Sequence, residues 1–385
     1  MYKLRDYQQK ASDAAVNFFR ASGNKNGILV LPTGAGKSLV IADIASKLEG
    51  YTLVFQPSKE ILEQNFQKLC SYGILDCSIY SASFNSKQIN RITFATIGSV
   101  KNHPELFKHF KNIIIDECHG VNPAEGMYKT FLSMLTCKVL GLTATPYRLY
   151  TNMLGAELKF ITRTRPRVFS EVIYHEQIST LLARGYLAKL EYYQVKTIDV
   201  SKLQVNSTGA DYTDRSVKQA YDTYGFMGKL MNVVERLLRV NRPNILVFTR
   251  FVEEARYVVD KLNGLAEIVT GETPKKEREE ILSAFKSGEI RVIANVGVLT
   301  TGFDFPELST VVLARPTMSL ALYYQMVGRA IRPHPSKTCS WIVDIADNYR
   351  RFGRVEDLKI VDGGNGKWYV ENNKRQLTNV CLQAT

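Results

Sequence analysis

The stretch LPTGAGKS (31–38) has residue types suited to binding phosphates. It follows an apolar run and precedes a helical pattern, so Gly34 and Gly36 can turn backbone N–H groups toward an anion beside the positive end of a helix dipole. Lys37 would then reach the β- and γ-phosphates of a nucleotide, and the Ser38 hydroxyl would ligate Mg²⁺. Leu31 stands where the strict pattern has glycine, so a simple glycine-rich turn is the alternative. The residues expected to line a nucleotide here are Thr33, Gly34, Ala35, Gly36, Lys37 and Ser38.

Paired carboxylates follow another apolar run, in IIIDECH (113–119). Asp116, at the carboxyl end of a strand, is placed to hold Mg²⁺ through water, and Glu117 to polarise an attacking water. A solvated acidic loop is the alternative, but ligands of open α/β sheets bind at this edge, and a phosphate loop precedes it in the chain. His119 has no Cys/His cluster nearby, which favours a polar bridge toward a second domain over a metal ligand.

A third candidate is the helical stretch SLALYYQMVGRAIRP (319–333), which Pro333 ends. Gln325, Arg329 and Arg332 stand at i, i+4 and i+7, so they are predicted to share one helix face. The arginines could form a carboxylate salt-bridge network or act as arginine fingers on a γ-phosphate. The second interpretation needs a phosphate site opposite, which the first half of the chain supplies.

The stretch NVGVLTTGFDFP (295–306) leaves a buried strand and enters a small, polar loop. Residues of this loop could contact a ribose or a phosphate. The alternative is that the loop is only a tight turn capped by an aspartate. The residues concerned are Thr300, Thr301, Gly302 and Asp304.

Short apolar runs separated by amphipathic segments set the expected fold. Near-continuous apolar runs are typical of parallel strands that helices cover on both faces, so the chain is predicted to be α/β with two similar halves. The predicted strands are 28–32, 51–57, 92–96, 112–117 and 139–145 in the first half, and 244–250, 266–271, 291–296, 310–316 and 339–347 in the second. Residues 189–200 alternate like a strand and are expected to join the second sheet.

The predicted division is a first domain over 1–150, a linker over 151–187, a second domain over 188–348 and a basic, polar tail over 349–385 that is partly loose. Residues 173–187 in the linker look helical. Residues 203–225 are polar and rich in tyrosine, and a surface excursion is expected there. Both this excursion and the tail are candidates for a strand-separating pin.

The 385 residues carry 50 Lys and Arg against 37 Asp and Glu, a net charge of +13 that raises the odds of a polyanionic partner. The composition excludes disordered, collagenous and disulfide-scaffold classes. The six cysteines form no CxxC pair, so a zinc ribbon is not expected. No signal peptide and no apolar run of membrane-spanning length is visible, and a cytoplasmic location is expected.

Together these motifs resemble those of superfamily 2 helicases, over roughly residues 1–347. The matching segments, in the order and spacing of that superfamily, are LRDYQ (4–8), PTGAGKS (32–38), FQPSKEILEQ (55–64), DECH (116–119), TAT (143–145), LVFTR (246–250), VLTTGFD (298–304) and QMVGRAIR (325–332). The wording is most similar to bacterial RadD-type DNA-repair helicases, and more loosely to phage UvsW-type helicases and restriction-enzyme motor subunits. RadD-type proteins also have a cysteine-rich zinc region, which these residues do not contain.

The resemblance implies two tandem RecA-like domains with a nucleotide cleft between them, and ATP and Mg²⁺ as cofactors. It implies adenine recognition by Arg5 and Gln8, coupling of hydrolysis to domain movement by Thr143 and Thr145, arginine fingers at Arg329 and Arg332, and the leading position of that motif at Gln325. The residues implied to contact nucleic acid are Gln56, Pro57, Ser58, Lys59, Thr96, Ser99, Thr249, Arg250 and Thr300.

The function expected is an ATP-driven helicase or translocase on branched, forked or gapped DNA. It would act as a monomer with repair or replication proteins as further partners. An RNA helicase would share every motif, because nothing in the sequence reads a 2′-hydroxyl. A translocase on duplex DNA that leaves the strands paired, and a nucleic-acid-binding module with an inactive site, also stay open.

Overall fold

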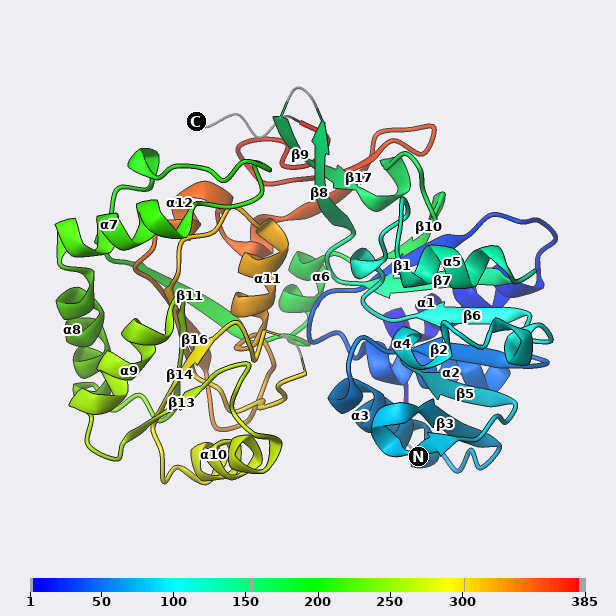
Figure 1. Ribbon diagram of the computed structural model, residues 1–385, viewed down its shortest axis with the longest axis horizontal. Helices are drawn as coiled ribbons and strands as arrows, with labels where there is room; N and C mark the ends of the chain where they lie inside the picture. The colour runs from blue at the N-terminus through cyan, green and yellow to red at the C-terminus, as the bar shows by residue number, and fades with distance from the viewer. Residues whose placement is uncertain (1–2, 153–154, 301, 381–385) are drawn as a thin grey trace. The chain divides into compact units, whose positions relative to one another are not determined.

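The computed structural model describes residues 3–152, 155–300 and 302–380, and its chain forms two compact units (Figure 1). The first contains residues up to Tyr150, Leu158–Gln177 and Lys359–Val380, and the second contains Thr151–Glu157 and Ile178–Leu358. The second unit is therefore built from chain that leaves the first unit and returns to it. In the described part of the chain, no helix is both long and apolar enough to span a bilayer.

The first unit is built on an eight-stranded sheet in the order β10-β1-β7-β6-β2-β5-β3-β4. All neighbouring pairs are parallel except β3 and β4. The strands are β1 (Gly27–Val30), β2 (Thr52–Phe55), β3 (Cys77–Ser81), β4 (Ser86–Lys87), β5 (Ile92–Ala95), β6 (Asn112–Ile115), β7 (Lys138–Thr143) and β10 (Glu171–His175). β1, β2, β5 and β6 are buried at every residue, which explains why their sequences are nearly continuous apolar runs.

Four helices of this unit lie between successive strands of the sheet, as crossover connections require, whereas the first helix precedes β1. They are α1 (Asp6–Arg20), α2 (Lys37–Lys47), α3 (Lys59–Cys70), α4 (Ile97–Val100) and α5 (Met127–Ser133). A small separate sheet pairs β8 (Tyr147–Asn152) with β9 (Gly155–Phe160). All five strands predicted for the first half are present, to within a few residues at their ends.

The second unit has a six-stranded, all-parallel sheet in the order β11-β16-β15-β12-β14-β13. Its strands are β11 (Lys189–Gln194), β12 (Ile245–Thr249), β13 (Ala266–Val269), β14 (Val292–Val296), β15 (Thr310–Ala314) and β16 (Cys339–Asp344). Its helices are α6 (Ile178–Ala183), α7 (Asp214–Tyr224), α8 (Phe226–Arg239), α9 (Val252–Lys261), α10 (Lys275–Ser287), α11 (Leu320–Gly328) and α12 (Asn348–Phe352). The prediction that 189–200 adds a strand to this sheet is confirmed by β11.

The two sheets with their crossover helices confirm the predicted α/β class and the two tandem RecA-like domains. Because the core strands of each sheet are parallel, their carboxyl ends lie at one edge of that sheet. The fold therefore gathers the strand ends and the segments that follow them. The motifs singled out in the sequence lie at these strand ends or begin just after them, except LRDYQ and QMVGRAIR.

The sequence predicted a surface excursion over residues 203–225, but part of this segment is buried. They contain α7, whose Val217 and Tyr221 are buried in the core of the second unit. Tyr221 stacks on Phe226 of α8 with ring centroids 3.8 Å apart, and its hydroxyl donates to the Ala314 carbonyl at 2.9 Å. The buried face of α7 is narrow, with four of its eleven residues inward. The many polar residues around it explain why the sequence did not indicate a buried helix.

Two further segments differ from the sequence prediction. Residues 173–187 were expected to be helical, but β10 runs through His175 and only Ile178–Ala183 form a helix. The predicted loose tail contains an antiparallel pair, β17 (Lys359–Asp362) and β18 (Trp368–Glu371), that belongs to the first unit. Trp368 stacks on Phe160, and the Phe160 N–H donates to Asn379 Oδ1 at 3.1 Å, so contacts distant in sequence hold this segment.

The burial of α8 leads to a stability prediction. Val234→Ala removes two buried carbons from a fully buried site and should lower the free energy of unfolding of the second unit by about 2 kcal/mol or more. Val240→Ala, at the 59% exposed end of the same helix, is the matched control and should change it little. Trp341 packs against this core and reports on it alone in a Trp368→Phe background, because the chain has 2 tryptophans. Equal urea midpoints for both variants would contradict the packing.

Candidate nucleotide and nucleic-acid site

The glycine-rich loop connects β1 to α2 with two residues in the left-handed region, Gly34 at φ +81° and Gly36 at φ +78°. Gly36 is the N-cap of α2, so Lys37 and Ser38 stand in the first turn, where the free N–H groups lie. A Cβ at Gly36 would come 2.5 Å from the Gln8 side-chain nitrogen. Both the backbone conformation and this close approach therefore require glycine at position 36.

The motif at 4–8 lies directly against this loop. Gln8 is 4% exposed; its Nε2 donates to the Ala35 carbonyl at 2.8 Å, and its Oε1 accepts from the Arg5 N–H at 2.9 Å. The Tyr7 hydroxyl donates to the same Ala35 carbonyl at 2.9 Å. α1 is therefore fixed to the phosphate loop through two side chains that share one carbonyl. Tyr7 was not singled out in the sequence.

An ion pair joins the phosphate loop to the acidic motif. Lys37 Nζ lies 3.1 Å from Glu117 Oε1, and both side chains are mostly buried. Glu117 follows strand β6 closely and has a left-handed backbone, φ +47°, which is uncommon outside glycine. Burial would raise the pKa of Glu117, but the Lys37 ammonium and then the His119 hydrogen bond hold it well below its usual range.

Asp116 behaves in the opposite way. Burial first, and the neighbouring Glu117 charge second, raise the pKa of its carboxyl to about 7. Its Oδ1 accepts from the Glu117 N–H at 2.9 Å, and its Oδ2 accepts from Asn65 Nδ2 at 3.4 Å. Two adjacent carboxyls thus differ in charge preference, as expected where one is paired to a cation and the other is not.

Asn65 on α3 was missed in the sequence. Its Nδ2 also donates to Gln56 Oε1 at 2.9 Å, which joins the end of β2 to the acidic motif. Gln56 is only 1% exposed, so its side chain is used inside the unit rather than displayed to a nucleic acid. A polar residue at a core position of an amphipathic helix was the available signal for Asn65.

The expected coupling residues are brought together. His119 Nδ1 lies 2.9 Å from the Thr143 hydroxyl, 3.1 Å from the Thr145 hydroxyl and 3.3 Å from Glu117 Oε2. Both threonines are fully buried at the end of β7. His119 therefore bridges the acidic motif to the TAT motif within the first unit.

The other residues implied to contact nucleic acid in the first unit lie after β2 and β5, which are neighbours in the sheet. Pro57 is exposed, and Ser58 caps α3 by accepting from the Ile61 N–H. Lys59 Nζ donates to the Ser83 carbonyl at 2.6 Å. The Thr96 and Ser99 hydroxyls lie 3.0 Å apart and are partly exposed. Their contact with nucleic acid stays a prediction.

The helix that was predicted over 319–333 is shorter. α11 ends at Gly328, and Arg329 is its C-cap, so Arg332 does not share a helix face with Gln325. Pro333 disfavours helical backbone at the residue before it, and the Ile331 carbonyl instead accepts from the Ala188 N–H at 2.7 Å, beside the start of β11.

Both predicted fingers make contacts inside the second unit. Arg329 donates to the Phe303 carbonyl at 2.8 Å, and Arg332 forms an ion pair with Asp304. Gly302 has φ +74°, and Thr300 is partly exposed. Thr301 lies outside the described residues.

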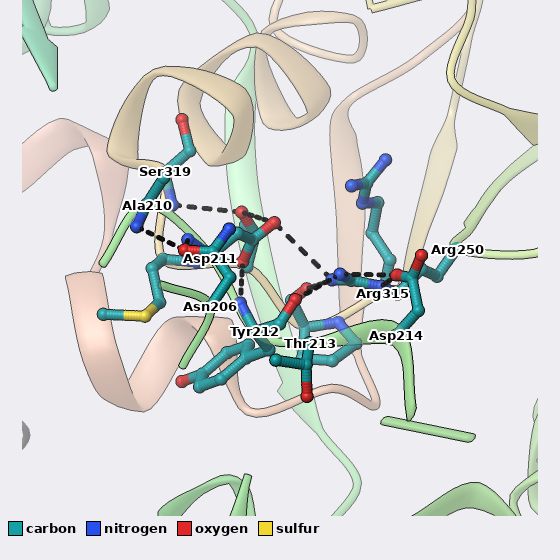
Figure 2. Close-up of polar contacts among 12 residues, drawn as sticks. Asn206, Ala210, Asp211, Tyr212, Thr213, Asp214, Arg250, Arg315 and Ser319 are labelled. Atoms are coloured by element: carbon teal, nitrogen blue, oxygen red, sulfur yellow. Dashed lines mark hydrogen bonds and ion pairs between the residues drawn. The ribbon is translucent and has the colours of Figure 1, made fainter. Parts of the chain in front are cut away.

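The motif at 249–250 is used inside the second unit. The fully buried Thr249 hydroxyl donates to the Phe251 and Asn295 carbonyls, each at 3.2 Å. The Arg250 side chain is 9% exposed and pairs with Asp211 at 3.5 Å and Asp214 at 2.9 Å (Figure 2). Arg250 thus anchors the segment before α7, which the sequence did not indicate.

Comparison with known families agrees with this arrangement. Residues 1–148 match the family described as "Type III restriction enzyme, res subunit", and residues 228–334 match "Helicase conserved C-terminal domain". The two matches fall on the two sheets described above.

Individual relatives share less than a third of their aligned residues with this chain. The chain is 28% identical over 331 residues to a 51.5 kDa protein of a Lactococcus phage, covering 84% of this chain and 66% of that protein. It is 28% identical to the DNA 3'-5' translocase XPB2 of Sulfurisphaera tokodaii, covering 86% of this chain and 79% of that protein. The structure of the ATP-dependent Type ISP restriction-modification enzyme LlaBIII bound to DNA has a TM-score of 0.66 at 20% identity, covering 89% of this chain and 27% of that one, which shows a shared fold.

With a phosphate loop, an acidic motif and a TAT motif joined in its first sheet, and both family matches in order, the chain belongs to the superfamily 2 helicases, a family of ATP-dependent helicases and translocases.

Proposed function

We propose that this chain is an ATP-driven motor that moves along nucleic acid, with DNA as the favoured track. The observation that carries the proposal is the ion pair of Lys37 with Glu117, because it brings a phosphate-binding cation and a candidate general base to the same point of one sheet edge. A triphosphate bound at the loop would compete with Glu117 for Lys37. The glutamate would then be released, still ionised, to orient an attacking water.

The residues present fit Mg²⁺, and that ion would neutralise phosphate charge and polarise the γ-phosphoryl group. Asp116 supplies a hard carboxylate oxygen whose ionised form is disfavoured by burial, a cost that a neighbouring cation offsets. Ser38 supplies a hydroxyl in the first turn of α2. Among the described residues no three His, Cys, Asp or Glu side chains cluster as metal ligands, so the ion would keep several waters, as Mg²⁺ prefers.

The chain's own residues suggest how hydrolysis is linked to movement. His119 contacts Glu117, Thr143 and Thr145, so a change at the glutamate passes directly to the end of β7. We further propose Arg329 and Arg332 as fingers that complete the nucleotide site from the second unit, and Gly302 and Asp304 as contacts near the nucleotide. In the present structure Asp304 holds Arg332, which would have to exchange this partner for phosphate.

The nucleic-acid side of the proposal depends on charge and on relatives. The net charge of +13 suits a polyanion, and phosphate contacts dominate the affinity of such motors. A relative is described as a DNA translocase, and a structural neighbour was seen bound to DNA. The resemblance to RadD-type proteins supports branched or gapped repair substrates. An RNA helicase and a duplex translocase are the competing functions.

The test of this function is the ATPase rate with no polymer, single-stranded DNA, forked DNA, duplex DNA and matched RNA. The proposal predicts the largest stimulation by single-stranded or forked DNA, weakening as salt increases. Stimulation by RNA alone would make the chain an RNA remodelling enzyme, and duplex-only stimulation would favour a translocase. No hydrolysis under any condition would overturn the proposal.

Lys37→Ala removes the cation of the phosphate loop and should lower ATP turnover by about a hundredfold or more. Lys47→Ala is the matched control, because Lys47 ends the same helix and pairs with Asp43 away from the loop. Steady-state phosphate release measures ATP turnover in both variants. Near-normal turnover in Lys37→Ala would show that the phosphate site lies elsewhere.

Glu117→Gln keeps the shape of the side chain but removes the base, so ATP should still bind while turnover falls by about 10²–10⁴-fold. Binding of a fluorescent ATP analogue and phosphate release separate the two effects. Glu105→Gln, on a carboxylate 57% exposed, should change neither. Equal loss of binding and turnover in Glu117→Gln would assign Glu117 a structural role.

Arg332→Ala should lower kcat by about 10³-fold with little change in ATP affinity, because a finger acts on charge that develops in the transition state. Arg239→Ala, on the exposed surface of α8, serves as the control. Comparable losses of kcat and affinity would instead identify the Arg332–Asp304 contact as a structural ion pair.

A further inference from the structure

Arg315 is a partly buried cation that the described structure leaves without a partner. It follows β15 directly, and β15 lies next to β12, the strand that leads to Arg250. Its Nε is buried and has no hydrogen-bond partner among the described residues, and none of the dashed lines in Figure 2 ends on its guanidinium. Leaving a guanidinium desolvated and unpaired is unfavourable, so its retention here requires an explanation.

The backbone around Arg315 is held in place by side chains from three other segments. The Asn348 side chain donates to the Arg315 carbonyl at 3.0 Å and accepts from the Thr317 N–H. Arg250 donates to the next carbonyl at 3.3 Å, and Asp211 accepts from the Met318 N–H at 2.9 Å. Residues 315–318 therefore form a fixed platform, and Arg315 is presented from it in a set position.

The neighbouring charges are already engaged with each other. Asp211 and Asp214 both pair with Arg250, and one oxygen of Asp211 accepts two backbone N–H groups. These carboxylates influence Arg315 electrostatically, but neither forms an ion pair with it. Burial lowers the pKa of Arg315 from its usual value, and the nearby Asp211 charge offsets this lowering only in part.

The two arginines at this sheet edge therefore have different roles. The sequence motif pointed to Arg250 as a contact for nucleic acid, yet its guanidinium is committed to Asp211, Asp214 and two carbonyls. Arg315 stands beside it with free donors, is only partly exposed, and lies at the carboxyl edge where such contacts are expected.

We propose that Arg315 binds a backbone phosphate of single-stranded nucleic acid, and that Arg250, Asp211 and Asp214 position it without touching the strand. This proposal rests on the proposed function. The ligand is a phosphodiester, which a guanidinium fork can bind with two parallel hydrogen bonds. The other source of the same chemistry is the triphosphate of ATP, and the experiment separates the two.

The experiment measures the binding of fluorescein-labelled oligo(dT) by anisotropy over a series of salt concentrations. Arg315→Gln should weaken binding about tenfold or more, because a charge-assisted contact is lost. The plot of log K against log salt should also become shallower by about 0.7, the value for one phosphate contact with a single strand. Arg239→Gln, which removes the same charge from an exposed side chain on α8, should leave affinity and slope unchanged.

The outcomes are distinguishable. Lower affinity with an unchanged salt slope would mean that Arg315 only supports the fold, and weaker binding of a fluorescent ATP analogue instead of DNA would place it at the nucleotide; either overturns the proposal. If wild type binds no oligonucleotide, the proposed function fails with it, whereas tight wild-type binding with no effect of Arg315→Gln overturns this inference alone. If Arg315→Gln does not fold, Arg315→Lys decides: several-fold weaker binding at the wild-type slope supports the fork geometry, and unchanged affinity overturns it.

Discussion

The ion pair between Lys37 and Glu117 links the phosphate loop of the first unit to its acidic motif, and the other contacts of the site extend from these two residues. The two residues come from loops after β1 and β6, which only β7 separates in the sheet, so parallel order and register bring them to the same edge. Each partner is tied to a further segment. Gln8 holds the phosphate loop, and His119 links Glu117 to the buried threonines after β7. A ligand that breaks this pair would therefore act on α1 and on the TAT motif at once.

The charges around this pair also set what the site can do. Glu117 is kept ionised by a close ammonium, whereas burial disfavours the ionised form of Asp116. One carboxylate is thus ionised but held by a cation that lowers its basicity, and the other lacks a close cation. The difference follows from which carboxylate pairs with Lys37: Glu117 Oε1 lies 3.1 Å from the Lys37 Nζ, whereas burial and the Glu117 charge act on Asp116.

The sequence predicted the parts of the structure that repeat a simple physical pattern. The parallel strands were visible because burial on both faces makes them continuously apolar, and the phosphate loop was visible because glycine is required at φ +78°. What could not be predicted depends on contacts between segments distant in sequence. The segment between α11 and Arg332 is held by a hydrogen bond to Ala188, and β17 and β18 are docked through Trp368 and Asn379. Likewise, a motif could point to Arg250 but not to the two aspartates that engage it.

If ATP hydrolysis drives this chain along a nucleic-acid strand, the chain should displace streptavidin from a biotinylated single-stranded DNA end. This motor function predicts that wild type removes the streptavidin in the presence of ATP, that a nonhydrolysable analogue does not support removal, and that the reaction slows as salt weakens phosphate contacts. Robust DNA-stimulated ATP hydrolysis without any displacement from either end would contradict it, since the site would then turn over nucleotide without movement.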